Sequence, residues 1–165
     1  MIGRVVVLAG GLSGAAGLSQ FPEYSQQYTQ RLAGAVDELT RFVSEFDADA
    51  RGLGLSRQEA LAELADGGAM GAARAQTMEG TLFRYDRLTS DLRALQNAGP
   101  FMRAYHAGRL SDAEIAEAAW QDYRPAMPLS FEGAVFGGVG LVAGMCLMAL
   151  VIGLIRMPFR RRRAA

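Results

Sequence analysis

The amino-acid sequence predicts an all-α protein in which two transmembrane helices flank an extracytoplasmic antiparallel helical hairpin with smaller packed helices. Residues 133–155 carry no charge over 23 consecutive positions, which is long enough for a membrane-spanning helix. Residues 32–46 and 78–95 repeat apolar side chains at alternating spacings of three and four, the pattern of amphipathic helices. No stretch outside the two apolar segments alternates apolar and polar residues as a half-buried strand does.

The C-terminal apolar run predicts a transmembrane helix over residues 131–157. At about 1.5 Å of rise per residue its 23 uncharged residues make a helix of roughly 35 Å, which exceeds the thickness of the hydrocarbon core. Ser130 is placed to cap this helix, and Glu132 lies in its first turn. A basic cytoplasmic tail follows over residues 158–165. The arginines at this end indicate the cytoplasmic side and a contact with anionic lipid: Arg156, Arg160, Arg161, Arg162 and Arg163.

The N-terminal apolar stretch, residues 1–20, predicts a second transmembrane helix or an uncleaved signal-like anchor. Residues 5–22 are uncharged, which is at the short end for a span. A cleaved signal peptide is the alternative, because the small residues Ala15 and Gly17 stand two apart before Leu18. We favour a retained anchor, since glycines interrupt the apolar core and the residues that follow suit a helix.

Charge is segregated along the chain, although the formal net charge is zero. All 17 carboxylates lie between Glu23 and Glu132, where 11 arginines bring the net charge to −6. Arg4 and the five arginines at the C-terminal end give the flanks a charge of +6. This split predicts cytoplasmic termini and a periplasmic middle domain, residues 21–130, in a bacterial inner-membrane protein. The acidic middle also argues against a nucleic-acid partner, which would require a basic face.

The first helix of the hairpin is predicted to begin near Pro22, which suits a first turn. Gly52 and Gly54 should end it, because glycine is the usual residue just after a helix. Its apolar seam follows a heptad spacing and consists of Leu32, Val36, Leu39, Val43 and Phe46.

The return half of the hairpin is predicted in two parts. Ser56 and Glu59 stand at capping-box spacing, so a short helix should begin at Arg57. A glycine pair at residues 67–68 indicates a kink or break before a second long helix over residues 69–97. The two seams are expected to pair with each other in the manner of a coiled coil. The second seam consists of Met78, Thr81, Tyr85, Leu88, Leu92 and Leu95.

Smaller helices are expected between the hairpin and the last span. Residues 101–110 have a marginal helical pattern. Ser111 and Glu114 form a second capping-box pattern, which predicts a helix that ends at about Tyr123, before Pro125.

Small residues recur four apart in both spans, which lets helix backbones approach closely in lipid. The alternative is that glycine is simply common in membrane helices. The spans could pack on each other, on a second copy or on other membrane proteins, and the pattern does not choose among these. The packing residues are Gly10, Gly14, Gly133, Gly137, Gly140 and Gly144.

No group of residues predicts catalysis, a cofactor site or a metal site, so the chain is expected not to be an enzyme. His106 is the single histidine, and its place near a helix end favours a surface or capping role. Cys146 is the single cysteine and lies in the second span, where a thiol acts as a small apolar filler.

Aromatic residues lie just outside both spans, where rings with a polar edge favour the interface between membrane and water. This pattern predicts a belt that holds the middle domain against the bilayer. Its members are Phe21, Tyr24, Tyr28, Trp120 and Tyr123.

Three segments carry a family resemblance. They are residues 17–28 (Gly-Leu-Ser-Gln-Phe-Pro-Glu-Tyr-Ser-Gln-Gln-Tyr), residues 30–39 (Gln-Arg-Leu-Ala-Gly-Ala-Val-Asp-Glu-Leu) and residues 123–129 (Tyr-Arg-Pro-Ala-Met-Pro-Leu). In these segments the chain resembles a family of small two-span bacterial (proteobacterial) inner-membrane proteins known as a domain of unknown function. The resemblance implies the two-span architecture and implies no activity.

Taken together, these patterns favour a non-enzymatic accessory or interaction protein of the inner membrane. Its expected partners are membrane lipids and the helices of other membrane proteins or of a second copy. The alternative is a carrier or sensor that binds a lipid or small apolar molecule at the membrane surface.

Overall fold

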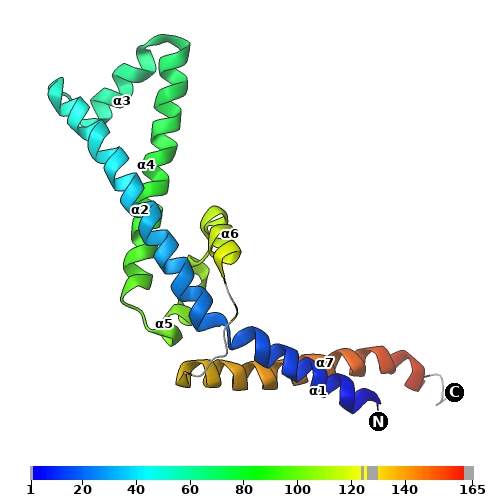
Figure 1. Cartoon of the computed structure of the whole chain (residues 1–165). Helices are drawn as coiled ribbons and strands as arrows, with labels where there is room; N and C mark the ends of the chain where they lie inside the picture. Colours follow the sequence, from blue (N-terminus) through cyan, green and yellow to red (C-terminus); the bar gives the residue numbers. More distant parts are fainter. Residues whose placement is uncertain (1, 124, 126–129, 162–165) are drawn as a thin grey trace. The chain divides into compact units, whose positions relative to one another are not determined.

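The computed structural model describes residues 2–123, 125 and 130–161, with side chains up to Ile155 (Figure 1). All regular structure in these residues is helical, which confirms the predicted all-α class. Arg162 and Arg163 lie outside the described residues. The elements in order are α1 (Ile2–Leu18), α2 (Phe21–Gly52), α3 (Arg57–Asp66), α4 (Gly68–Gln96), α5 (Pro100–Tyr105), η1 (Ala107–Arg109), α6 (Ala113–Asp122) and α7 (Phe131–Arg161).

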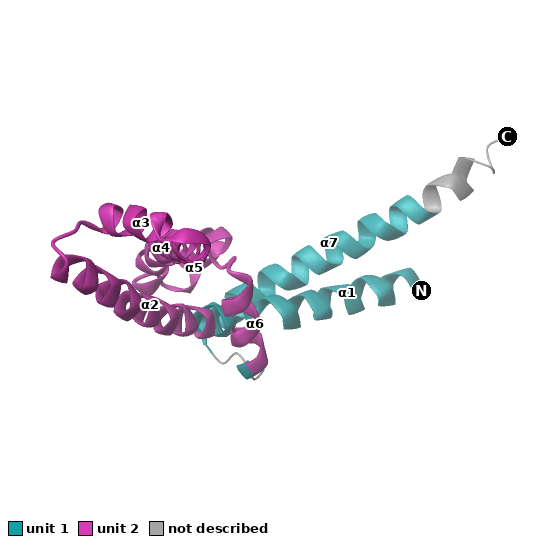
Figure 2. Ribbon diagram, turned by 90° about the horizontal axis from the view of Figure 1, so that it is seen from above, with its two compact units in different colours: residues 1–26, 122–165 teal, residues 27–121 magenta. Residues whose placement is uncertain are grey.

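The chain divides into two compact units (Figure 2). Unit 1 contains residues 1–26 and 122–165, and therefore holds α1 and α7. Unit 2 contains residues 27–121 and holds most of α2 together with α3, α4, α5 and η1 and nearly all of α6.

Unit 1 is a pair of antiparallel helices, which lie side by side in both views (Figures 1 and 2). Two helical stretches are long and apolar enough to cross a membrane, one near the N-terminus within Ile2–Gly52 and one over Phe131–Ile155. The predicted cap of α7 is confirmed, since the Gly133 backbone N–H donates to Ser130 Oγ at 3.1 Å. The helix continues to Arg161, four residues beyond the expected end of the span.

Unit 2 buries part of the apolar seams of α2 and α4. Figure 1 shows these two helices running in opposite directions, with α3 between them at the turn. Leu32, Leu88 and Leu95 have no exposed surface, and a fully buried leucine contributes about 1.5–3 kcal/mol to folding. Ile115 and Ala119 bring α6 into the same core.

The turn between α2 and α3 follows the predicted glycine and capping signals. Gly54 has φ of 75°, a left-handed conformation that favours glycine. The Leu55 N–H donates to Ala50 O at 2.9 Å and the Gly54 N–H donates to Arg51 O at 3.0 Å, which together make a Schellman motif. Leu55 therefore folds back over the last turn of α2.

The capping box that opens α3 is confirmed. The Glu59 N–H donates to Ser56 Oγ at 3.3 Å, and the Ser56 N–H donates to Glu59 Oε2 at 2.7 Å. The hydrogen bond from the Ser56 backbone holds the pKa of the Glu59 carboxyl below its usual range. A break separates α3 from α4 at the glycine pair, where Gly68 has φ of 80°.

Two local predictions need correction between α4 and α7. Asp112, not Ser111, caps α6, because Asp112 Oδ1 accepts the Ile115 N–H at 3.3 Å. The marginal helix over residues 101–110 divides into α5 and η1, with a turn at His106.

Candidate functional site

The glycines of α1 and α7 meet where the two helices cross. A Cβ atom added at Gly14 would collide with the carbonyl oxygen of Gly140, and one added at Gly144 would collide with that of Gly10. A Cβ at Gly137 would lie 3.5 Å from the Ser19 side chain. Within the described chain, these small residues therefore bring α1 and α7 into backbone contact.

Two further glycines of α1 and α7 are buried. Gly133 is buried at the start of α7. Gly11, which the four-residue spacing did not single out, is buried as well, against Leu141 and Met145. By contrast, added Cβ atoms at Gly138 and Gly153 would meet no atom within 4 Å.

The outward faces of α1 and α7 are apolar. Among the described residues they expose large hydrophobic side chains that include Ile2, Val5, Leu8, Leu12, Val139, Val142, Leu147, Leu150 and Leu154. Such faces suit lipid rather than water, because lipid tails solvate them without a hydrophobic penalty.

An aromatic cluster lies within unit 1, beside the ends of the apolar helices. The rings of Phe21 and Phe136 have centroids 5.3 Å apart, and those of Tyr24 and Tyr123 meet edge-on at 6.2 Å. The Tyr123 hydroxyl donates to Gln20 Oε1 at 2.5 Å. Burial raises the pKa of both tyrosines. The sequence did not single out Phe136, because it lies inside a run of apolar residues.

Tyr28 does not belong to this cluster, and its assignment to a membrane belt is wrong. Its side chain has no exposed surface, and its hydroxyl accepts the Asp112 N–H at 3.1 Å within unit 2. Tyr28 precedes Leu32 and Val36 at spacings of four, so it extends the buried seam of α2. Trp120 is 68% exposed on α6.

Asp112 is the buried charged residue of unit 2, with only 7% of its surface exposed. Its carboxylate accepts from Arg87 at 2.7 Å and from Arg84 at 3.2 Å. Arg84 also pairs with Glu114 at 2.6 Å. These bonds join α4 to α6, so the cluster holds the fold together.

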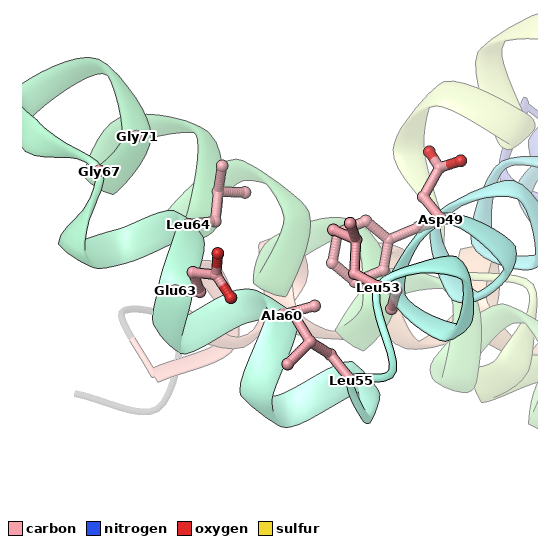
Figure 3. A pocket seen from close by; sticks show the side chains of 10 residues that line it. Asp49, Leu53, Leu55, Ala60, Glu63, Leu64, Gly67 and Gly71 are labelled. Carbon is pink, nitrogen blue, oxygen red and sulfur yellow. The ribbon is translucent and has the colours of Figure 1, made fainter.

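An apolar groove opens where the end of α2, α3 and the start of α4 meet; we call it the tip groove (Figure 3). It encloses about 350 Å³. A second part of about 300 Å³ adjoins it and shares Phe46, Asp49 and Leu64. The apolar lining comprises Phe42, Phe46, Ala50, Leu53, Leu55, Ala60, Leu64 and Met78.

Carboxylates surround the tip groove. Glu45, Asp49 and Glu63 line it, are exposed, and make no ion pair within the described part of the chain. The neighbouring Asp47 is different, because it pairs with Arg57 at 2.5 Å. That hydrogen bond holds the pKa of the Asp47 carboxyl below its usual range. Arg74 also lines the second part, so the groove combines an apolar floor with three carboxylates and one arginine, and its net charge is negative.

The remaining chemistry-bearing residues do not form a site. Among the described residues, no group of three histidine, cysteine, aspartate or glutamate side chains is placed to hold a metal ion. The His106 ring packs edge-on against Tyr105 at 5.1 Å, and Cys146 is exposed on α7.

A family model matches residues 2–161, from the first residue of α1 to the last of α7. The chain belongs to DUF2937. This family is described as a protein of unknown function, which confirms the resemblance found in the sequence. No curated protein and no solved structure matches the chain. The DUF2937 match includes both units, so one family model covers the apolar helix pair and the tip groove.

Proposed function

We propose that this DUF2937 protein is a non-enzymatic accessory protein of the bacterial inner membrane, which docks a partner protein in its tip groove. The observation that carries the proposal is the groove itself, with its apolar floor and the unpaired carboxylates Glu45, Asp49 and Glu63. Charge complementarity favours a partner helix that presents apolar side chains flanked by arginine or lysine.

The groove lies far along α2 from the end of that helix that follows the first apolar helix. Phe46 lies 25 residues after Phe21 on α2, a distance of about 38 Å along the helix. This length along α2 suits a partner that has an extracytoplasmic domain of its own. Met70, near the start of α4, has an exposed side chain that adds apolar surface beside the groove.

The membrane orientation is part of the same proposal. Because α1 and α7 are antiparallel, the N-terminal end of α1 and the C-terminal end of α7 lie on the same side of the membrane. The arginines at these two ends favour the cytoplasmic side. We expect a reporter fused after Gly99 to be periplasmic and one fused after Ala165 to be cytoplasmic. A cytoplasmic reporter at Gly99 would refute this orientation.

Site-specific photocrosslinking tests the docking proposal. A photoreactive amino acid at Leu53, in the tip groove, should capture a protein in intact membranes, whereas one at Glu79, outside it on α4, should not. Asp49→Arg with Glu63→Arg should reduce the Leu53 adduct roughly tenfold, as expected for loss of charge complementarity. A protein adduct that the double variant leaves unchanged, or that forms equally from Glu79, would count against the proposal.

A small apolar ligand or lipid is the second candidate, because the groove volume of about 350 Å³ falls in the range of ligand pockets. In that case the Leu53 probe should form a lipid adduct in place of a protein adduct. Neutral lipid capture should also resist the double charge reversal, while Leu64→Asp on the groove floor should abolish it.

A further inference from the structure

Residues 92–111 differ in charge from the rest of unit 2. This stretch contains three arginines and His106 but no aspartate or glutamate, whereas the middle of the chain as a whole is acidic. The segment covers the end of α4, all of α5 and η1. Its surroundings in the sequence are acidic on both sides, with Asp91 before it and Asp112 after it.

The same segment exposes large apolar side chains. On α5, Phe101, Met102 and Tyr105 are 46%, 51% and 80% exposed. Phe101 and Tyr105 stand four residues apart, so they share one face of the helix. Arg103 lies between them in sequence, and no ion pair engages it in the described residues; only its Nε donates to Leu95 O at 3.3 Å. Arg109, in contrast, pairs with Asp91 at 2.8 Å.

Chain length limits how far the C-terminal end of this segment can lie from the first apolar helix. The Tyr28 hydroxyl binds the Asp112 backbone directly after the segment, at 3.1 Å. Tyr28 follows Leu18, the last residue of α1, by ten residues, which is about 15 Å when helical. The chain is therefore short enough at this point for α5 to reach the surface of a membrane that α1 would cross.

We propose that α5 and the turn after it rest on the headgroup layer of the membrane, and that they bind the phosphate groups of anionic phospholipids. Aromatic rings such as Tyr105 favour the interfacial region. Arg103 supplies the positive charge that anionic headgroups attract. In this proposal the contact determines the orientation of unit 2 at the bilayer, independently of any partner in the tip groove.

Fluorescence quenching in lipid nanodiscs tests this proposal on the full chain. Trp120 is the single tryptophan and is largely exposed. Trp120→Phe therefore gives a parent chain without tryptophan fluorescence and leaves the core undisturbed. Tyr105→Trp then places one reporter on α5. Phe83→Trp is the matched control, because Phe83 is 73% exposed on α4. Lipids that carry a quencher near the headgroup should quench the α5 reporter at least roughly twofold more than the α4 reporter, as an interfacial position requires.

Lipid charge supplies the second arm of the experiment. Quenching of the Tyr105→Trp reporter should grow with the fraction of anionic phospholipid, and Arg103→Glu should remove that dependence. Equal quenching of both reporters, or none at Tyr105→Trp, would overturn the proposed contact. If the degree of quenching changed neither with the fraction of anionic phospholipid nor with Arg103→Glu, the proposed recognition of phosphate groups would be refuted. None of these results depends on a protein adduct at Leu53, so this proposal and the docking proposal fail separately.

Discussion

The two units of this protein are both helical, yet large apolar side chains face outward in unit 1 and inward in unit 2. In unit 1, α1 and α7 touch through glycines such as Gly14 and Gly140, and their leucines and valines face outward. In unit 2, Leu32, Leu88 and Leu95 face inward, and most charged side chains face outward. Unit 2 has the pattern of a protein core in water, and unit 1 has the pattern suited to lipid.

The contrast follows from what holds helices together in each solvent. In water, burying apolar area contributes about 25 cal/mol per Å², so the largest side chains drive the contact. In lipid that gain disappears, and close backbone approach with tight packing takes its place. Glycine, which is destabilising inside most soluble helices, becomes the favoured contact residue.

The largest effect is expected from a charge in the core of unit 2. Leu88→Asp should destabilise unit 2 by about 4 kcal/mol or more, because it buries an unpaired carboxylate where no surface is exposed. Thermal unfolding of the detergent-solubilised chain, followed by near-ultraviolet circular dichroism, measures it. Phe83→Asp, at an exposed position on the same helix, should leave the melting temperature nearly unchanged.

In unit 1 the damaging change is a larger apolar residue, which would be harmless or helpful in many soluble helices. Gly140→Leu with Gly144→Leu should separate α1 from α7 at a cost of about 1–3 kcal/mol per site, since each side chain would meet backbone. Spin labels at Val5 and Leu150, in a Cys146→Ser background, report the separation in nanodiscs as a longer and broader distance distribution.

Gly138→Leu with Gly153→Leu is the matched control, because it makes the same chemical change on α7 where an added Cβ meets nothing. The label distances should then stay as in the parent chain. If both double variants behaved alike, the glycine contact would not be what holds the pair together.

The smallest effect distinguishes a core tyrosine from an interfacial one. Tyr28→Phe should cost about 1–2 kcal/mol, because it leaves the buried Asp112 N–H without its acceptor. Tyr105→Phe, which removes an exposed hydroxyl, should cost almost nothing. Equal melting temperatures for the two variants would contradict the buried role of Tyr28 and favour its original assignment to the membrane belt.

Part of the candidate sites could be inferred from sequence, and part could not. Gly10, Gly14, Gly140 and Gly144 stood out because close helix approach needs small residues at a fixed spacing. Tyr28 was misassigned because its position beside the first span matched an aromatic belt as well as it matched a core seam. The tip groove was missed altogether, since Phe46, Leu55 and Leu64 come from α2, the turn after it and α3, with no common spacing.

The sequence by itself determined the helical class, the two apolar helices and the caps at Ser56 and Ser130, because these depend on neighbouring residues within one segment. Tertiary structure decided that the glycines of α1 meet those of α7, that Tyr28 is buried, and that Asp112 rather than Ser111 caps α6. Each of these outcomes depends on which distant elements share a surface. Burial and hydrogen-bond partners across that surface are long-range quantities, which no periodicity within a single helix encodes.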